Sequence, residues 1–221
     1  MTRHHPDQAM LLDYASGAAS EAESLLVATH LTYCPRCRSE VDELECLGGT
    51  LLDSIEPSLP APSSCDEVLD RLGREPRPTS RPVPPQVLPQ FQGLPRPIQR
   101  LLAASDRVPA WRRVMAGLDV LDLPARPPEG AGSMVRLMRL QPGVAVPQHT
   151  HRGEEFTLVL AGGFSDDTGH YQVGDIASCD GSISHRPAAD LGEPCVSLVV
   201  TTGPVRLASP IGRLASLFVR V

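Results

Sequence analysis

The chain has 221 residues, of which 41% are hydrophobic and only 4% aromatic, so any core must rest on aliphatic side chains. This length allows one large domain or two small ones. No apolar run approaches the roughly 20 residues that span a bilayer, and the sequence MTRHHPDQAM at the N-terminus lacks the apolar stretch of a signal peptide. We therefore expect a cytoplasmic protein with no membrane partner.

The charge is unevenly distributed along the chain. All 20 basic residues are arginine; residues 1–75 carry a net charge of −9 and residues 76–221 a net charge of +3, which together give the overall −6. A strongly negative first segment argues against nucleic acid as a partner, because phosphates would repel it. It favours a basic partner protein, although a merely solvated acidic helical surface accounts for the charge equally well.

Residues 6–73 have the periodicity of helices. The sequence predicts one helix that ends at Gly17, a second that opens with an S-x-x-E capping box at Ser20, a third that begins at Pro35, and a short fourth after a proline cluster. Residues 76–97 then contain 8 prolines in 22 positions and no acidic residue, which is typical of a semi-rigid linker. Residues 98–104 could add one or two helical turns.

From about Trp111 the pattern changes to short apolar segments separated by turn signals at intervals of about ten residues, which predicts an all-β sandwich or barrel. We therefore expect two domains: a helical domain over residues 1–75, a proline-rich linker over 76–108 and a β domain over 109–221.

A first metal site is predicted by the spacing H-x3-C-x2-C of His30, Cys34 and Cys37. The histidine and the first cysteine lie at one helix end and the second cysteine in the first turn of the next helix, so one ion can reach all three. Two thiolates and an imidazole suit tetrahedral Zn²⁺, with His4 or His5 as the fourth ligand. A segment of about 70 residues with few aromatics has a marginal core that a structural zinc would stabilise. The alternative, a redox C-x-x-C, requires a preceding strand, and this segment is helical on both sides.

A second metal site is predicted by the segment G-x5-H-x-H-x3-E-x6-G over residues 143–162. Extended strands alternate sides, so His149, His151 and Glu155 share one face while Glu154 points to the other. The spacing resembles the first motif of cupins at every position. Of the second cupin motif, Gly174 and His185 keep their offset although other positions differ, which makes His185 the expected fourth ligand. Three histidines and a glutamate accept Zn²⁺, Mn²⁺, Fe²⁺ or Ni²⁺. The resemblance implies a double-stranded β-helix, or jelly-roll barrel.

The first motif, in turn, resembles the signature of zinc-binding anti-sigma domains, which consist of three helices and a separate fourth. The upstream histidine of that signature corresponds to His5 better than to His4, so the implied zinc ligands are His5, His30, Cys34 and Cys37. The resemblance implies that residues 1–75 bind a group IV (extracytoplasmic-function, ECF) sigma factor and block its access to RNA polymerase.

Such a module, followed by a linker and a cupin, resembles the ChrR-type anti-sigma factors over nearly the whole chain, including the sequence VP-x-H-x-HRG-x-E at 146–155. The resemblance implies a non-enzymatic regulator whose cupin, holding zinc, releases the sigma factor in response to singlet oxygen or organic peroxides. Cys179 and Cys195 are candidate oxidisable neighbours of the cupin metal. Two alternatives stay open: a metal-dependent cupin dioxygenase or isomerase with an N-terminal interaction module, and a DNA-binding zinc finger, which the negative charge disfavours.

Overall fold

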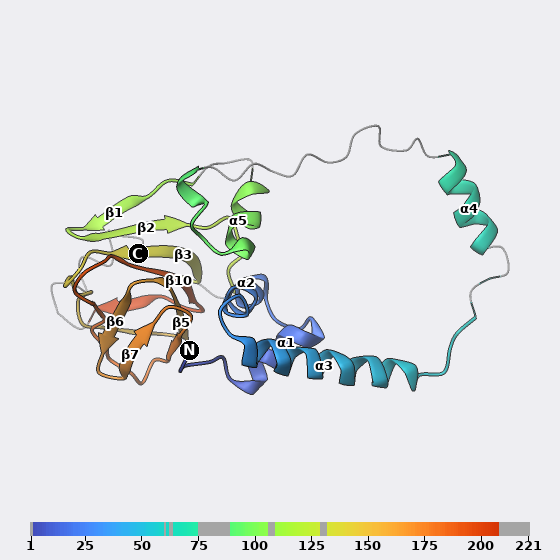
Figure 1. Ribbon diagram of the computed structural model, residues 1–221, viewed down its shortest axis with the longest axis horizontal. Coiled ribbons are helices and arrows are strands. Elements are labelled where there is room, and N and C mark those ends of the chain that lie inside the picture. The colour runs from blue at the N-terminus through green and yellow to red at the C-terminus, as the bar shows by residue number, and fades with distance from the viewer. Residues whose placement is uncertain are drawn as a thin grey trace.

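The computed structural model describes residues 2–59, 61, 64–74, 89–105, 109–128 and 132–207. A helical part comes first and an all-β part second, which confirms the predicted fold class (Figure 1). The helices are α1 (Gln8–Ser16), α2 (Glu21–His30), α3 (Pro35–Asp53), α4 (Ser64–Arg74), the 3-10 helix η1 (Pro89–Phe91) and α5 (Arg96–Ala103). Within the described ranges, no helix has both the length and the apolar character needed to cross a bilayer.

The predicted helix boundaries follow from local chemistry. Asp7 caps α1 by accepting the amide of Met10, and Gly17 ends it in the left-handed conformation at φ 76°. The predicted capping box of α2 is confirmed, because Ser20 and Glu23 each accept the other's backbone amide. Pro35 is the first residue of α3, where its missing amide costs nothing.

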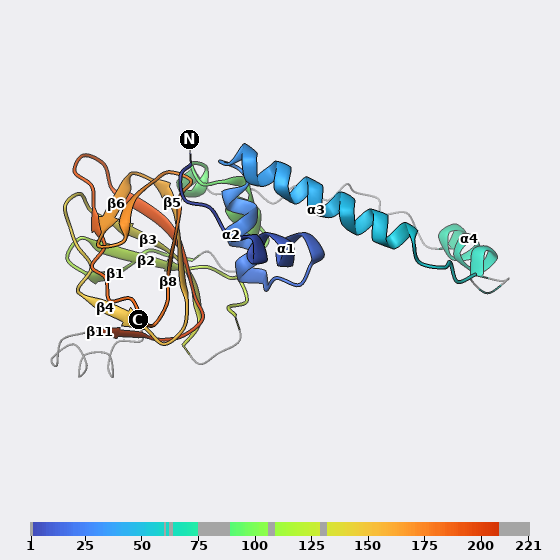
Figure 2. The same cartoon turned by 90° about the horizontal axis from the view of Figure 1, so that it is seen from below.

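The β part is a two-layered barrel, as the resemblance to cupins implies. A large sheet has the strand order β1-β2-β3-β10-β5-β8, and the opposite layer consists of a three-stranded sheet β7-β6-β9 and a two-stranded sheet β11-β4 (Figure 2). The strands of the large sheet are β1 (Arg112–Met115), β2 (Leu118–Asp122), β3 (Met134–Leu140), β5 (Glu155–Ala161), β8 (Ile176–Cys179) and β10 (Cys195–Thr201). Those of the opposite layer are β4 (His149–His151), β6 (Gly163–Asp166), β7 (Gly169–Gln172), β9 (Ala188–Ala189) and β11 (Val205–Leu207).

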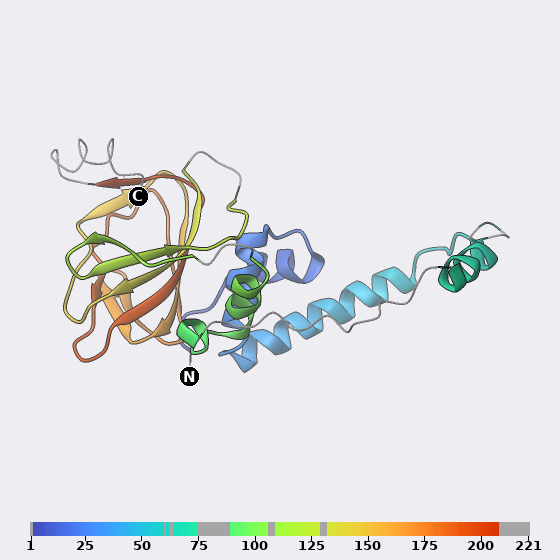
Figure 3. The same cartoon turned by 90° about the horizontal axis from the view of Figure 1, so that it is seen from above.

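The large sheet is buried on both faces. Along β5, Glu155 and Val159 face the barrel interior, whereas Phe156 and Leu158 face outward. The outward residues share one apolar core with the N-terminal helices, including Leu26 of α2. The two predicted domains are therefore packed on one another rather than tethered, and α2 and α5 lie between the sheet and the rest of the helical part (Figure 3).

The predicted linker over residues 76–108 needs a correction. Residues 76–88 lie outside the described residues, but η1 and α5 fall within the predicted linker and are anchored. Ile98 of α5 is fully buried in the shared core, and Phe91 and Leu102 are also buried. The helical turns that the sequence suggested over 98–104 are thus real, and they close one side of the interface between the two parts.

Helix α4 lies apart from the other elements in all three views (Figure 1). Among its described residues none is buried; Val68, Leu69 and Leu72 are each more than half exposed. The second half of α3 and the turn after it likewise expose large apolar side chains, namely Leu47, Leu51, Leu52 and Ile55. These seven residues form what we call the α3–α4 apolar face.

Candidate metal centres

The N-terminal centre brings together His5, His30, Cys34 and Cys37, whose ligand atoms all lie within 4.8 Å of one another. The Nδ1 atom of His5 lies 3.4 Å from both sulfurs, and the Nε2 atom of His30 lies 3.3 Å from Cys37 Sγ. Three of the four residues are buried and His5 is half-buried. His4 points elsewhere, with its ring against Tyr171 of the cupin, so the geometry favours His5 over His4.

The protonation of this centre suits a cation. Burial lowers the pKa of His30, which keeps the imidazole neutral. Burial acts to raise the pKa of Cys34, but hydrogen bonds from Thr2 and from the amide of Cys37 outweigh it and lower that pKa. Burial and the neighbouring Cys34 sulfur raise the pKa of Cys37 to about 12. A cation such as Zn²⁺, bound tetrahedrally by the two sulfurs and the two imidazoles, would stabilise both cysteines as thiolates.

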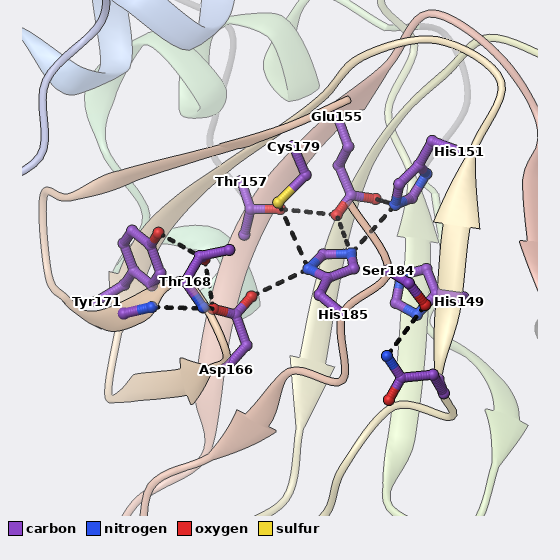
Figure 4. Close-up of polar contacts among 12 residues, drawn as sticks. His149, His151, Glu155, Thr157, Asp166, Thr168, Tyr171, Cys179, Ser184 and His185 are labelled. Carbon is purple, nitrogen blue, oxygen red and sulfur yellow. Dashed lines mark hydrogen bonds and ion pairs between the residues drawn. The ribbon is translucent and has the colours of Figure 1, made fainter. Parts of the chain in front are cut away.

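The cupin centre brings together His149, His151, Glu155 and His185, again with all ligand atoms within 4.8 Å (Figure 4). The Nε2 atoms of His151 and His185 are 3.2 Å apart, and each lies less than 4 Å from a carboxylate oxygen of Glu155. His149 is the first residue and His151 the last residue of the short strand β4, and His185 pairs with His149 across a β-bridge. Glu154, which alternation placed on the opposite face, is exposed.

Hydrogen bonds orient two of these imidazoles toward a common point. Nδ1 of His149 donates to the carbonyl of Pro147 at 2.8 Å, and Nδ1 of His185 donates to the carboxylate of Asp166 at 3.0 Å. Each Nε2 atom therefore presents a lone pair to the interior. Lone pairs that converge on a carboxylate are the donor arrangement of a divalent cation site, so these residues fit a metal.

Desolvation dominates the electrostatics of the cupin centre. Burial lowers the pKa of His149 to about 4 and that of His151 to about 3, and it raises the pKa of Glu155 to about 7. The imidazoles of His149 and His151 are therefore neutral at physiological pH, and each can donate a lone pair to a metal. A cation would reverse the effect on Glu155 by stabilising its ionised form.

Asp166 holds the metal-site residue His185 in place, a role that the sequence did not reveal. It lies at the end of β6 with its side chain fully buried, and hydrogen bonds from Thr168 and His185 outweigh burial and lower its pKa. Together with Cys179 and His185 it forms a further close group of potential ligand atoms. A carboxylate that holds the outer nitrogen of a metal-binding histidine fixes its tautomer and raises its basicity.

The interior next to the cupin centre is small and mostly apolar. A cavity of about 60 Å³ is lined by His149, Glu155 and His185 together with Met138, Phe164, Cys179 and Cys195. Both cysteines are buried, and burial raises the pKa of each to about 12. They are therefore protonated thiols beside the metal site rather than activated thiolates. The volume suits a molecule of a few atoms, not a sugar or a nucleotide.

The comparisons with known proteins agree with this architecture. Residues 99–206 match the family model of the ChrR cupin-like domain. The anti-sigma-E factor ChrR of Cereibacter sphaeroides is 35% identical over 222 residues, covering 99% of each chain. The crystal structure of Rhodobacter sphaeroides SigE in complex with the anti-sigma ChrR matches with a TM-score of 0.71 and 33% identity, over 91% of this chain and 99% of that chain.

These comparisons define the class as a cupin-containing regulator of transcription rather than an enzyme. More specifically, the chain belongs to the ChrR family of anti-sigma factors, which confirms the resemblance drawn from the two motifs. The family decides against the enzyme alternative that the cupin motif by itself left open.

Proposed function

We propose that this chain sequesters an ECF sigma factor in the cytoplasm through residues 1–75, and that the cupin over residues 109–221 releases it when it senses a signal. The observation that carries the proposal is the α3–α4 apolar face. Its seven residues are between 53% and 69% exposed, on α3, on the turn that ends it and on α4, which extend away from the barrel. Exposed apolar surface of this extent is characteristic of an interface.

Charge and shape support a sigma factor as the occupant. The net charge of −9 over residues 1–75 complements a partner whose surfaces bind DNA and are therefore basic. A groove of about 490 Å³ between α1 and α3 adjoins the apolar face at Leu47; its lining includes Leu11, Leu12, Glu40 and Glu43. The relative solved with SigE is itself an anti-sigma protein of the same architecture.

We assign zinc to the N-terminal centre as a structural ion. Two sulfurs and two imidazoles are the donor set that tetrahedral Zn²⁺ prefers, and the four ligands leave no position open. The ion would join the segment before α1, the end of α2 and the start of α3. For the cupin centre we propose a divalent metal held by His149, His151, Glu155 and His185, with zinc favoured over Mn²⁺, Fe²⁺ or Ni²⁺.

The signal we propose is a small oxidant such as singlet oxygen or an organic peroxide. The cavity beside the cupin metal is too small for a bulky metabolite, and oxidisable side chains of Met138, Cys179 and Cys195 line it. Zinc is redox-inert, so the signal would act through the side chains that surround the ion. A change there must weaken sigma binding by differential contacts between two states of the cupin.

The binding proposal is tested with the full chain and a co-expressed ECF sigma factor. Leu51→Glu and Leu69→Glu place a charge in the α3–α4 apolar face, and we expect each to weaken binding by about 30-fold or more, as for a central interface residue. Leu191→Glu is the matched control, since Leu191 is 87% exposed on a cupin loop. Equal affinity in all three variants would refute this location of the interface.

The sensing proposal is tested in the same system. His149→Ala should leave sigma binding intact but alter its release by singlet oxygen or a peroxide. Cys34→Ser, in contrast, should abolish binding in the absence of any oxidant, because the helices lose their ion. An unchanged oxidant response in His149→Ala would remove the cupin metal from the signalling role.

A further inference from the structure

The cupin contacts the ligands of the N-terminal metal centre. His30 is fully buried, and its Nδ1 atom lies 2.8 Å from the carbonyl oxygen of Gly174, in the turn between β7 and β8. A carbonyl can only accept, so Nδ1 carries the proton and Nε2 presents its lone pair toward Cys37. The tautomer and the ring orientation of this ligand are thus set by a residue 144 positions away.

The same turn holds the segment that delivers His5. Oδ1 of Asp175 accepts the amides of Arg3 at 2.6 Å and His4 at 3.1 Å, and the amide of Ile176 donates to the carbonyl of His4 at 3.2 Å. Asp175 is only 2% exposed. The backbone directly before His5 is therefore fixed on the cupin by three hydrogen bonds.

The contact is too close for a side chain at Gly174. A Cβ atom there would lie 2.5 Å from Cγ2 of Thr2 and 2.9 Å from Cβ of Tyr33, in the turn between α2 and α3. The turn also connects the two metal centres. Strand β8 begins at Ile176 and ends at Cys179, whose sulfur lies 3.5 Å from Nδ1 of His185.

We propose that Gly174 and Asp175 are positioning residues for the N-terminal metal, so that the cupin itself sets how firmly the anti-sigma module holds its ion. The inference rests on the proposed zinc site. It gives a physical reason why a change in the cupin reaches the sigma-binding helices: two of the four ligands, His5 and His30, depend on the placement of one cupin turn.

The test uses the full chain loaded with Co²⁺. All variants and the parent chain carry Cys179→Ser, because the Cys179 sulfur lies beside His185 and could also bind cobalt. In this background thiolate-to-cobalt absorption reports on the N-terminal centre, since His149, His151, Glu155 and His185 offer no sulfur. The measurement is the rate at which this absorption is lost to excess chelator. Asp175→Ala removes the acceptor, and Arg3→Pro removes one of its donors without altering the barrel. Asp119→Asn is the matched control, since Asp119 accepts hydrogen bonds from Arg113 and Arg139.

We expect Asp175→Ala and Arg3→Pro to lose the thiolate-bound cobalt about 10- to 100-fold faster than the parent chain, as for other residues that orient metal ligands. Loss of cobalt from the cupin centre, followed as the remaining bound metal, should be unchanged. Rates within twofold of Asp119→Asn, or equal acceleration at both centres, would overturn the inference and leave the proposed function standing. A parent chain without thiolate-to-cobalt absorption would overturn the zinc assignment and the inference with it.

Discussion

If the two parts share one core, a cavity at their junction must destabilise both. Ile98→Ala is the sharpest perturbation, because Ile98 is fully buried between α5, α2 and the large sheet. Removing three carbons costs about 2.4 kcal/mol in transfer free energy, and the residual cavity brings the loss to about 3–4 kcal/mol. For a chain of this size we expect the melting temperature to fall by on the order of 10 °C.

The assay follows two probes of thermal unfolding in the metal-loaded protein. Ellipticity at helical wavelengths reports mainly on the N-terminal part, and the fluorescence of Trp111, the single tryptophan, reports on the cupin, where its ring packs against the Arg139 guanidinium. Both transitions should coincide in the parent and shift together in Ile98→Ala. A shift of the helical transition with unmoved Trp111 fluorescence would refute the shared core.

Three further predictions concern the cupin. Asp166→Asn should lower the affinity of the cupin for its metal about 10- to 100-fold in a chelator competition. Asp167→Asn, at the exposed neighbouring residue, is the control and should not change it. Equal affinities of the two variants would contradict the role of the Asp166 carboxylate. In metal-free protein the pKa of His149 is about 4 against 6.5 when unfolded, so the unfolded chain binds more protons between these values. His151, with a pKa of about 3, adds a similar loss of stability, whereas Glu155, with a pKa of about 7, binds its proton more tightly in the folded chain and offsets one of the two losses. Stability to urea should therefore fall by about 3 kcal/mol as the pH drops from 6.5 to 4, and a flat profile would count against it. Finally, mass spectrometry after brief alkylation should find the exposed Cys46 labelled well before the buried Cys179. The raised pKa of Cys179, about 12, leaves about 1000-fold less thiolate than an ordinary thiol. Comparable labelling of the two would show that Cys179 is accessible.

Three ligands of each set could be predicted because local geometry brings them together, whereas His5 and His185 were implied by the family resemblances. Between His30 and Cys37 the chain crosses one helix end, and between His149 and Glu155 it alternates along extended backbone, so spacing in sequence translates directly into spacing in the fold. The helix boundaries were equally local, since caps such as Ser20 act within one turn.

The contacts that join the two parts could not be predicted in this way. Arg3 and Asp175 lie 172 positions apart, and no spacing rule links them. The pairing of Asp166 with His185 likewise depends on how the barrel closes. One signal was present, however: the strands FTLVLA at 156–161 and CVSLVV at 195–200 are apolar on both faces, which indicates a sheet covered on both sides. The proline-rich composition before α5 instead suggested a linker between two separate domains.

The segment that delivers His5 has a second consequence, which concerns solubility. Strand β8 is an edge strand of the large sheet, and the unpaired backbone groups of an edge strand can pair with strands of other molecules. The amide of Ile176, the first residue of this edge strand, already donates to the carbonyl of His4. Removing residues 2–5 would therefore do more than take away a metal ligand, because it would uncover a template for self-association, and the shortened protein should form aggregates that the intact chain does not.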